Sequence, residues 1–319
     1  PVYRGMTTGW APRWWPRLNA ALVRRAAASM YDRYRRAHGA PDVVHAHCAL
    51  YAGACAATLR RRYGMPYVLT EHSSAYARGL IRPWQAELVR DGLAGAGALV
   101  ALSDALVRDM RRYVGDRPVE MIGEIVDTAF FTPPTEEPPA SPFRLCTVAL
   151  LGANKGIDVL LEAFAAAFHE ADATLTIAGD GPERQALESL AGNLGVRDRV
   201  VFAGRLDRDA VRALIRSSHV LVSASHVETF GITLIEAMAC GRPVVATRSG
   251  GPESFVDARC GLLVPPGDPA AMADALSAVR RDWSRFDPAV IRALVVDRFD
   301  QAVIAERLEA LYAAVVASR

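Results

Sequence analysis

The sequence predicts an α/β protein of two doubly wound, Rossmann-like domains that face each other across a cleft. Three observations lead to this fold class. The chain has 319 residues, which suits two domains of about 150 residues each. Short β-branched runs alternate with helical patterns, as is typical of a parallel sheet with helices on both faces. A proline-rich segment, 132–142, interrupts this alternation, which then starts again.

The first half of the chain carries four expected strands, at 42–47, 67–70, 98–102 and 119–122. The helices expected around them lie at about 14–37, 49–63, 84–94 and 104–113. The segment 132–142 holds five prolines in eleven residues, so it cannot continue a helix or a central strand. We therefore predict an N-terminal domain over 1–131 and a linker over 132–142.

A second domain is expected over 143–299. Its predicted strands are 144–149, 174–178, 199–203, 219–223, 243–246 and 262–264. Its predicted helices are about 156–169, 183–194, 207–217, 231–240 and 269–281. One long amphipathic helix is expected at 300–317. We also consider an arrangement in which the segment 300–319 packs back on the N-terminal domain. Ligands of such folds bind at the carboxyl ends of the strands.

The hydrophobic runs, the N-terminal residues and the cysteine count indicate the class of protein and its compartment. The sequence has no run of 18 or more apolar residues, so no membrane-spanning helix is expected. It starts with Pro1 and shows no hydrophobic leader, from which we expect a cytoplasmic protein whose first residue lies inside a longer chain. Five cysteines without paired spacing indicate reduced thiols rather than a disulfide framework.

The most informative motif follows the strand expected at 219–223. Glu228 and Glu236 flank seven residues at the predicted start of a helix, for which Thr229 is the expected N-cap. The first amides of a helix form an anion site, and eight helical steps span roughly 12 Å. One carboxylate could therefore hold a sugar and the other a ribose, with a diphosphate between them. The alternative is that both glutamates are ordinary loop and surface residues.

This stretch resembles the glutamate, seven residues, glutamate motif of retaining glycosyltransferase family 4. Further segments are similar to that family in order and spacing: 177–183, 201–205, 243–251 and 261–268. The resemblance covers about 139–281 strongly and 42–131 moderately. It implies the GT-B fold and the retaining, metal-independent transfer of a hexose-type sugar from a nucleotide-sugar to a saccharide or lipid-linked acceptor in polysaccharide biosynthesis.

The resemblance also implies roles for individual residues. Glu228 would hold the donor sugar and Glu236 the ribose, while Gly204 and Arg205 would lie beside the base. The groups that would contact sugar and phosphate are the amides or hydroxyl of Phe230, Gly231, Ile232 and Thr233. His72 would contact the donor sugar near the reacting carbon; its alternative is a structural role, as for His45 and His47.

Lys155 is the only lysine among 37 basic Lys and Arg residues. A cation beside a diphosphate leaving group stabilises the charge that grows as the glycosidic bond breaks. We therefore predict this role for Lys155, with a solvated loop lysine as the alternative. No metal-ligand cluster or cofactor motif is visible in the sequence.

The chain departs from the family pattern at three places. Leu150 stands where the family has an arginine, which removes one of the two usual phosphate cations. Glu124 occupies the asparagine position of a hinge motif, which weakens any role for that loop. The first strand and glycine-rich loop of the N-terminal domain are not visible. These departures keep open a second function, a non-catalytic GT-B remnant that binds nucleotide-sugar.

Two other functions are disfavoured. An oxidoreductase would need a G-x-G-x-x-G motif after the first strand of a domain, and neither domain has one. A nucleic-acid binder is indicated only by the arginine content, without a known motif.

The region 10–36 predicts an anionic membrane surface as a further partner, on the inner face of the membrane. It combines arginines with Trp10, Trp14 and Trp15 at its start and Tyr31 and Tyr34 near its end. Aromatic rings suit the headgroup boundary, and each arginine near an anionic surface contributes about 1 kcal/mol. The alternative is a solvated helix whose aromatic residues pack on the N-terminal domain.

Overall fold

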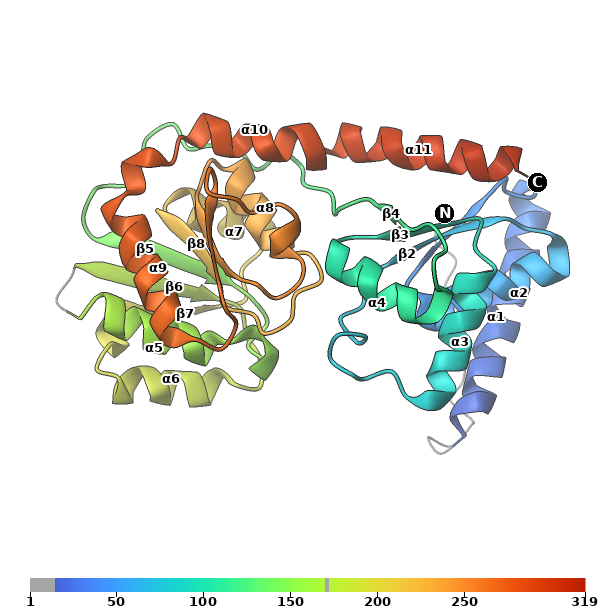
Figure 1. The fold of residues 1–319 in the computed structure, drawn as a ribbon, viewed down its shortest axis with the longest axis horizontal. Coiled ribbons are helices and arrows are strands. Elements are labelled where there is room, and N and C mark those ends of the chain that lie inside the picture. Colours follow the sequence, from blue (N-terminus) through green and yellow to red (C-terminus); the bar gives the residue numbers. More distant parts are fainter. Residues whose placement is uncertain (1–14, 170–171, 319) are drawn as a thin grey trace. The chain divides into compact units, whose positions relative to one another are not determined.

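The computed structural model describes residues 15–169 and 172–318, and it divides into two compact units. The first unit contains residues up to 122 together with the segment from 305 onward, and the second contains residues 123–304. Each unit is a parallel β-sheet with helices packed on it (Figure 1).

The first unit has a four-stranded sheet. Its strands are β1 (Val44–His47), β2 (Tyr67–Glu71), β3 (Ala98–Ala101) and β4 (Glu120–Met121). Its helices are α1 (Pro16–His38), η1 (Ala49–Gly53), α2 (Ala54–Tyr63), α3 (Pro83–Ala94), α4 (Asp104–Val114) and the part of α11 (Gln301–Ala317) from residue 305 onward.

The strands of the first unit are all parallel, in the order β1-β2-β3-β4. All five residues of β2 are buried, as expected for an inner strand of a parallel sheet. Helix α1 packs on this unit through Ala28 and Tyr31, which join Leu59 and Met65 in one hydrophobic cluster. A second cluster joins α1 to α2 and α3.

The second unit has a six-stranded parallel sheet. Its strands are β5 (Phe143–Val148), β6 (Ala173–Ala178), β7 (Val200–Gly204), β8 (Val220–Ser223), β9 (Val244–Thr247) and β10 (Gly261–Val264). Its main helices are α5 (Ile157–Ala167), α6 (Arg184–Asn193), α7 (Arg208–Arg216), α8 (Ile232–Ala239), α9 (Pro269–Arg281) and α10 (Pro288–Phe299). Short helical turns are η2 (Ala153–Lys155), η3 (Arg197–Arg199), η4 (Pro252–Ser254) and η5 (Trp283–Arg285).

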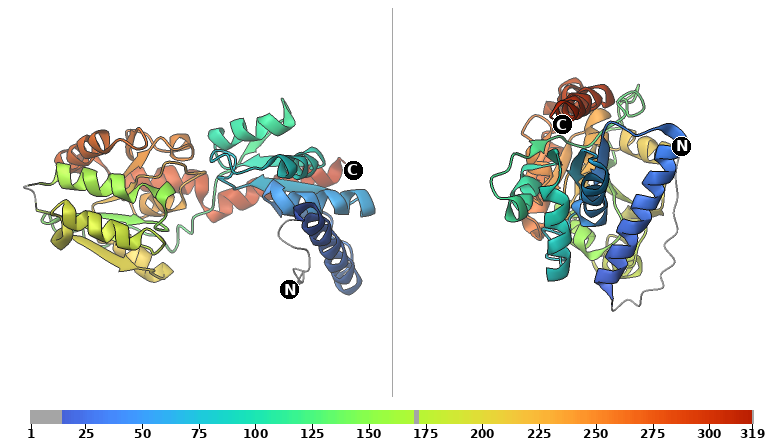
Figure 2. Two further views of the ribbon diagram at one scale, coloured as in Figure 1. Left: turned by 90° about the horizontal axis from the view of Figure 1, so that it is seen from below. Right: turned by 90° about the vertical axis from the view of Figure 1, so that its right-hand side faces the viewer.

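The strand order of the second unit is β10-β9-β8-β5-β6-β7. Strands β6 and β7 therefore follow β5 on one side of the sheet, and β8, β9 and β10 follow on the other side. Helix α5 packs on α6 and α9, whereas α8 packs on α7 and α10 (Figures 1 and 2). The point between β5 and β8, where the order reverses, is where open parallel sheets bind ligands.

The division between the units lies at residues 122 and 123, before the proline-rich segment at which the sequence placed the boundary. The intervening residues already pack on the second unit. Arg292 of α10 donates hydrogen bonds of 2.8 Å to the carbonyls of Thr128 and Phe131. Glu137 accepts from the buried guanidinium of Arg242. The proline-rich segment is thus fastened to this unit.

Two features of the second unit differ from the sequence-based expectations. Helix α10 was not predicted, although Asp287 followed by Pro288 is a helix-start signal, and the Asp287 side chain accepts from the amide of Ala289. The second concerns α8, whose N-cap is Gly231 rather than Thr229. Gly231 has a φ of +106°, a conformation that side chains rarely adopt, and it delays the helix to Ile232.

Candidate functional site

A cavity of about 340 Å³ opens at the carboxyl ends of β5 and β8, where the strand order reverses. Residues 147–150 line it from the end of β5, and residues 223–225 from the end of β8. The start of α8 and the loop before it complete the wall. The site residues predicted from the sequence that line this cavity are Lys155, Glu228, Phe230, Gly231, Ile232 and Thr233.

Lys155 and Glu228 form an ion pair inside the cavity. The Lys155 ammonium lies 2.7 Å from Oε2 of Glu228, and about a fifth of each side chain is exposed. Lys155 ends the turn η2, which the left-handed Gly156 separates from α5. A side chain at Gly156 would collide with the carbonyl of Ala224, so this glycine lets the lysine loop approach β8 closely.

The backbone holds Glu228 in place. Its amide donates to the carbonyl of Ser249, and its own carbonyl accepts from the amide of Gly251. The loop before it is tied to the lysine loop, since the amide of His226 donates to the carbonyl of Asn154. The two charged residues are therefore presented by segments that are hydrogen-bonded to their neighbours.

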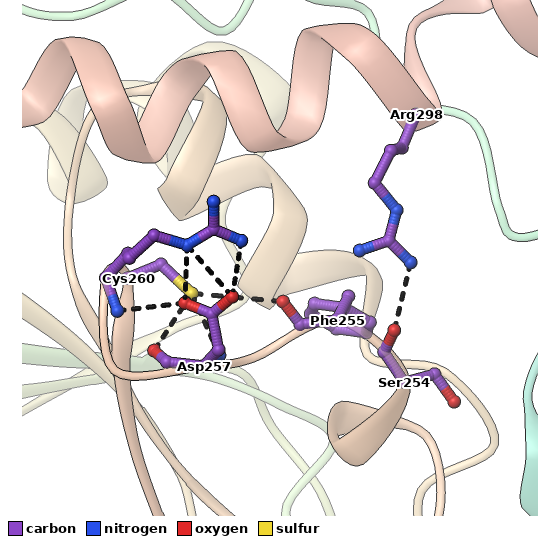
Figure 3. Close-up of polar contacts among 6 residues, drawn as sticks. Ser254, Phe255, Asp257, Cys260 and Arg298 are labelled. Atoms are coloured by element: carbon purple, nitrogen blue, oxygen red, sulfur yellow. Dashed lines mark hydrogen bonds and ion pairs between the residues drawn. The ribbon is translucent and has the colours of Figure 1, made fainter.

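An aromatic cluster supports the cavity wall at Phe230. The buried Phe230 ring contacts Phe255 and Phe299, at centroid distances of 5.0 and 5.3 Å. Figure 3 shows how the loop beside Phe255 is held: Arg298 of α10 donates to the carbonyl of Ser254. Helix α10 therefore supports Phe230, in the loop before α8, through Phe299, and it supports the loop between β9 and β10 through Arg298.

A second cavity of about 310 Å³ adjoins the first and shares residues 148–150 with it. Asp180 and Arg205 line it from the ends of β6 and β7. Gly204 ends β7 with a φ of +70°, and its carbonyl accepts from the amide of Gly179. Leu150, which is 60% exposed, borders both cavities and supplies no charge to either.

Glu236 lies one turn into α8 and lines neither of these two cavities. Its carboxyl group forms no hydrogen bond or ion pair to the residues that the structure describes. Burial raises the pKa of Glu236 to about 7, and the positive charge of Arg208 opposes that rise. A half-buried carboxyl group of this kind is ready to accept hydrogen bonds from a ligand.

His72 lies in the first unit, just after β2. Its Nε2 is 2.8 Å from Nδ1 of His47, and the His47 ring contacts His45 at a centroid distance of 4.3 Å. The structure therefore gathers three histidines that the sequence analysis treated separately.

Several residues of helix α1 belong to the region 10–36, for which a membrane surface was predicted as a partner. Tyr31 is buried in the first unit against Tyr63, so its ring is not available to a surface. Arg17 and Arg24 form ion pairs with Glu87 and Asp91 of α3. Trp15 is 57% exposed. Trp10, Arg13 and Trp14 lie outside the described residues.

Further residues, beyond those predicted from the sequence, line the first cavity. Glu124 lines the first cavity, so the loop whose role was judged weak does reach the site. Thr147, Ser223 and Ser225 line the same cavity. Their position at strand ends was a usable signal, but these small residues have no distinctive spacing. Across residues 15–169 and 172–318, no three His, Cys, Asp or Glu side chains form a metal-binding group.

Comparisons with known protein families identify the chain. Residues 142–282 match the family model described as glycosyl transferases group 1, and residues 5–130 match glycosyltransferase family 4. A phosphatidyl-myo-inositol mannosyltransferase of Mycobacterium leprae is 33% identical over 320 residues, covering 94% of this chain and 81% of the relative. The chain belongs to the group 1 glycosyltransferases of family 4.

Other relatives of this glycosyltransferase differ in the function their names give. An N-acetyl-alpha-D-glucosaminyl L-malate synthase of Bacillus anthracis is 28% identical over 284 residues, covering 85% of this chain and 74% of the relative. Among solved structures, sucrose-phosphate synthase from Thermosynechococcus elongatus has a TM-score of 0.81 and 25% identity, covering 97% of this chain and 81% of its own. Anabaena HepE with UDP and glucose has a TM-score of 0.78 and 21% identity, covering 92% of this chain and 82% of its own.

The fold of the glycosyltransferase is therefore GT-B, with two parallel-sheet units of the Rossmann type. Within the described residues, no helix has the length and apolar content needed to cross a membrane. All five cysteines are free thiols, of which Cys146, Cys240 and Cys260 are buried.

Proposed function

We propose that this glycosyltransferase moves a hexose-type sugar from a nucleotide-sugar to a saccharide or lipid-linked acceptor, with retention of anomeric configuration and without a metal. The observation that carries the proposal is the cavity at the strand-order reversal, with Lys155 and Glu228 paired inside it. Relatives whose names include mannosyltransferase, and a structural neighbour solved with UDP and glucose, support this class of donor.

The charges of the cavity fit such a donor. The diphosphate would take the ammonium of Lys155 and the amides at the start of α8, where the helix dipole favours negative charge. Glu228, released from Lys155, would accept hydrogen bonds from sugar hydroxyls. The adjoining cavity beside Arg205 would hold the base, and Glu236 would accept from the ribose. Leu150 leaves Lys155 as the only Lys or Arg among the residues lining the first cavity.

The proposed reaction proceeds on one face of the donor sugar. The acceptor oxygen bonds to the anomeric carbon on the face from which the diphosphate leaves, and the acceptor proton passes to the departing phosphate oxygen. Lys155 and the amides of α8 stabilise the charge on that leaving group without a metal. Glu228, whose carboxylate is paired with Lys155, serves here in sugar binding rather than as a nucleophile.

A transfer assay tests this proposal. The protein is incubated with a panel of nucleotide-sugars and simple saccharide acceptors, and nucleotide release is followed with and without EDTA. We expect turnover that EDTA leaves unchanged and a product whose anomeric proton has the donor's configuration by NMR. An inverted product contradicts the retaining mechanism, and abolition by EDTA contradicts the metal-free reaction. Nucleotide binding without any transfer would favour the non-catalytic alternative.

Glu236 makes nucleotide affinity depend on pH. The charged carboxylate is the stronger acceptor, so ribose binding favours its deprotonated form. Because the pKa of the free carboxyl is about 7, affinity for a nucleoside diphosphate should fall about tenfold from pH 8 to pH 6. Titration calorimetry at several pH values measures the affinity. The variant Glu236→Gln lacks the titrating carboxyl group, so its pH profile gives the contribution of the phosphate alone. A wild-type profile parallel to that of Glu236→Gln contradicts the assignment.

Removing the carboxyl group gives a simpler measurement at fixed pH. Glu236→Ala at pH 8 should weaken binding of the nucleoside diphosphate by about 1.5–3 kcal/mol, the range for a hydrogen bond to a charged group. Unchanged affinity would mean that the ribose does not contact Glu236.

The acceptor-side proposal includes an anionic membrane surface that contacts α1. Arg25, Arg33 and Arg36 lie on this helix. Among the described residues, none of the three forms an ion pair. Binding to anionic vesicles should occur at low salt, weaken with added salt and weaken again in Arg25/Arg33→Glu, which leaves the ion pair of Arg24 with Asp91 intact. Co-sedimentation with anionic and neutral vesicles measures it. Absence of binding to anionic vesicles at low salt would leave a soluble acceptor.

A further inference from the structure

The loop between β1 and α2 carries an exposed aromatic side chain on a strained backbone. This loop contains η1 (Ala49–Gly53), and it leaves the carboxyl end of β1. Within it, Tyr51 has a φ of +65° and a ψ of −64°. These angles are those of the rare, strained γ-turn, which residues with a side chain seldom adopt. A glycine would occupy the position without strain, yet the sequence has a tyrosine there.

The neighbours of Tyr51 hold its backbone in this conformation. On one side, Leu50 packs against the hydrophobic cluster that joins α1, α2 and α3. On the other side, Gly53 lies against Gly92 of α3, where a Cβ atom on Gly92 would come within 2.8 Å of the backbone of Gly53. The loop is therefore packed tightly before and after the tyrosine, and this packing imposes the strain at position 51.

A buried carboxyl group fixes the start of the same loop. Glu71, the last residue of β2, is fully buried. Its Oε2 accepts a hydrogen bond of 2.8 Å from the amide of Ala49 and one of 2.7 Å from the hydroxyl of Tyr76. Its Oε1 accepts from the amide of Ser73. Glu71 thus ties the loop after β1 to the loop after β2, so Tyr51 has a defined position at this edge of the sheet.

The side chain of Tyr51 has no polar or aromatic partner that would explain the strain. It is 38% exposed. Within residues 15–169 and 172–318, it forms no hydrogen bond, and its ring contacts no other aromatic ring and no cation. Backbone strain that the surroundings impose is concentrated at sites that bind ligands. We therefore looked for a ligand that an exposed tyrosine ring at this place would contact.

The place of the loop in the fold indicates the ligand. Strands β1, β2 and β3 are parallel, so their carboxyl ends share one edge of the sheet, and open parallel sheets bind ligands at that edge. A tyrosine ring offers a flat apolar face with a polar tip. The ring of a sugar or a cyclitol has C–H groups on its face and hydroxyl groups at its rim. The two shapes are complementary.

We propose that Tyr51 is a specificity-determining residue of the acceptor site, and that its ring stacks on the face of a sugar or cyclitol ring of the acceptor. That this ring belongs to a glycosyl acceptor rests on the proposed function. The contact itself is argued from the first unit alone. The family resemblance assigned no role to this residue.

Fluorine NMR tests the contact directly. The protein is labelled with 3-fluorotyrosine, and the Tyr51 signal, one of nine, is assigned by its loss in Tyr51→Phe. The probes are methyl α-glucoside, methyl α-mannoside and myo-inositol. We expect at least one of them to shift the Tyr51 signal, and the absence of a shift with all three overturns the proposal. A shift without any sugar transfer would support the contact and contradict the proposed function, so the two failures are distinguishable.

Variants that change the ring test its effect on transfer. With the probe that shifts the Tyr51 signal as acceptor, kcat/KM should fall about tenfold in Tyr51→Ala, the upper value for one aromatic contact. Tyr51→Trp keeps an aromatic face and should stay within about threefold of the wild type. Affinity for a nucleoside diphosphate should not change, because its proposed site lies in the other unit. Leu18→Ala, with a similar exposed fraction on α1, is the matched control.

Tyr51→Gly separates the loss of the ring from a loss of structure. Glycine adopts a φ of +65° without strain, whereas alanine keeps the strained Cβ atom. The denaturation midpoint of Tyr51→Gly should therefore lie above that of Tyr51→Ala, while transfer is equally low in both. Wild-type transfer in either variant overturns the proposal. So does a loss of transfer that follows the loss of stability across the two variants, since the ring would then serve packing.

Discussion

Replacement of Lys155 by alanine is expected to lower turnover by about 10²–10³, because charge on the diphosphate grows as the glycosidic bond breaks. Lys155 is the only Lys or Arg among the residues lining the first cavity, since Leu150 stands where a second cation is usual. Binding of the donor should weaken much less, because the ground state carries less charge on the breaking bond. Steady-state kinetics and calorimetry on the same variant measure the two effects.

The ion pair with Glu228 sharpens this experiment. In the structure the ammonium contacts Glu228 at 2.7 Å, so a bound diphosphate must compete with that carboxylate. Glu228→Gln should therefore bind a free nucleoside diphosphate more tightly than the wild type while transferring sugar more slowly. Lys155→Arg is the conservative control and should retain part of the activity. Equal losses of turnover and donor binding in Lys155→Ala would mean that the lysine contributes only uniform binding.

Replacement of Glu137 by alanine is expected to lower the free energy of unfolding by about 3 kcal/mol, as when one partner of a buried ion pair is removed. Arg242 is 1% exposed and donates to Glu137 in the proline-rich segment and to the carbonyl of Arg216. Its Nε has no hydrogen-bond partner among the described residues. Removal of one partner from a buried ion pair costs about 3–5 kcal/mol. We expect the low end of this range because Glu137 is 49% exposed, so water partly replaces the lost carboxylate. Denaturant titration measures the change.

Two variants control for this prediction. Glu136 is an exposed neighbour in the same segment, and Glu136→Ala should change stability by less than about 0.5 kcal/mol. Arg242→Met removes the charge together with its need for a partner, so the double variant with Glu137→Ala should be more stable than Glu137→Ala alone. If Glu137→Ala behaves like Glu136→Ala, solvent satisfies Arg242 and the segment is not fastened by this pair.

The alternation of strands and helices made much of the fold predictable from the sequence. All ten predicted strands are present, with ends shifted by one or two residues, because buried β-branched runs form parallel strands. Helix α10 was missed because its turns lack a clear amphipathic pattern, and only Asp287 and Pro288 signalled its start. The N-cap of α8 was misplaced because Thr229 is a good capping residue, whereas Gly231 was selected by its backbone conformation.

The residues of the first cavity were predictable in part. Glu228, Lys155 and residues 230–233 line it. The family resemblance assigned them all to one donor site, and that role stays a prediction. The contact between Lys155 and Glu228 joins residues 73 positions apart, which no local pattern could reveal. Glu236 was expected beside a nucleotide, but only the structure gives its burial and its raised pKa. The histidine cluster depends on the register of β1 and β2, which sequence periodicity does not determine.

Hydrogen–deuterium exchange with a bound nucleotide tests the central claim most directly, namely that the cavity between β5 and β8 is the donor site. Calorimetry against a panel of nucleoside diphosphates first selects the one that binds, and exchange is then compared with and without it. We predict slower exchange at residues 152–156 and 229–235, which carry Lys155, Glu228's loop and the first turn of α8. Failure of every nucleotide to bind, or protection confined to the first unit, would contradict this account.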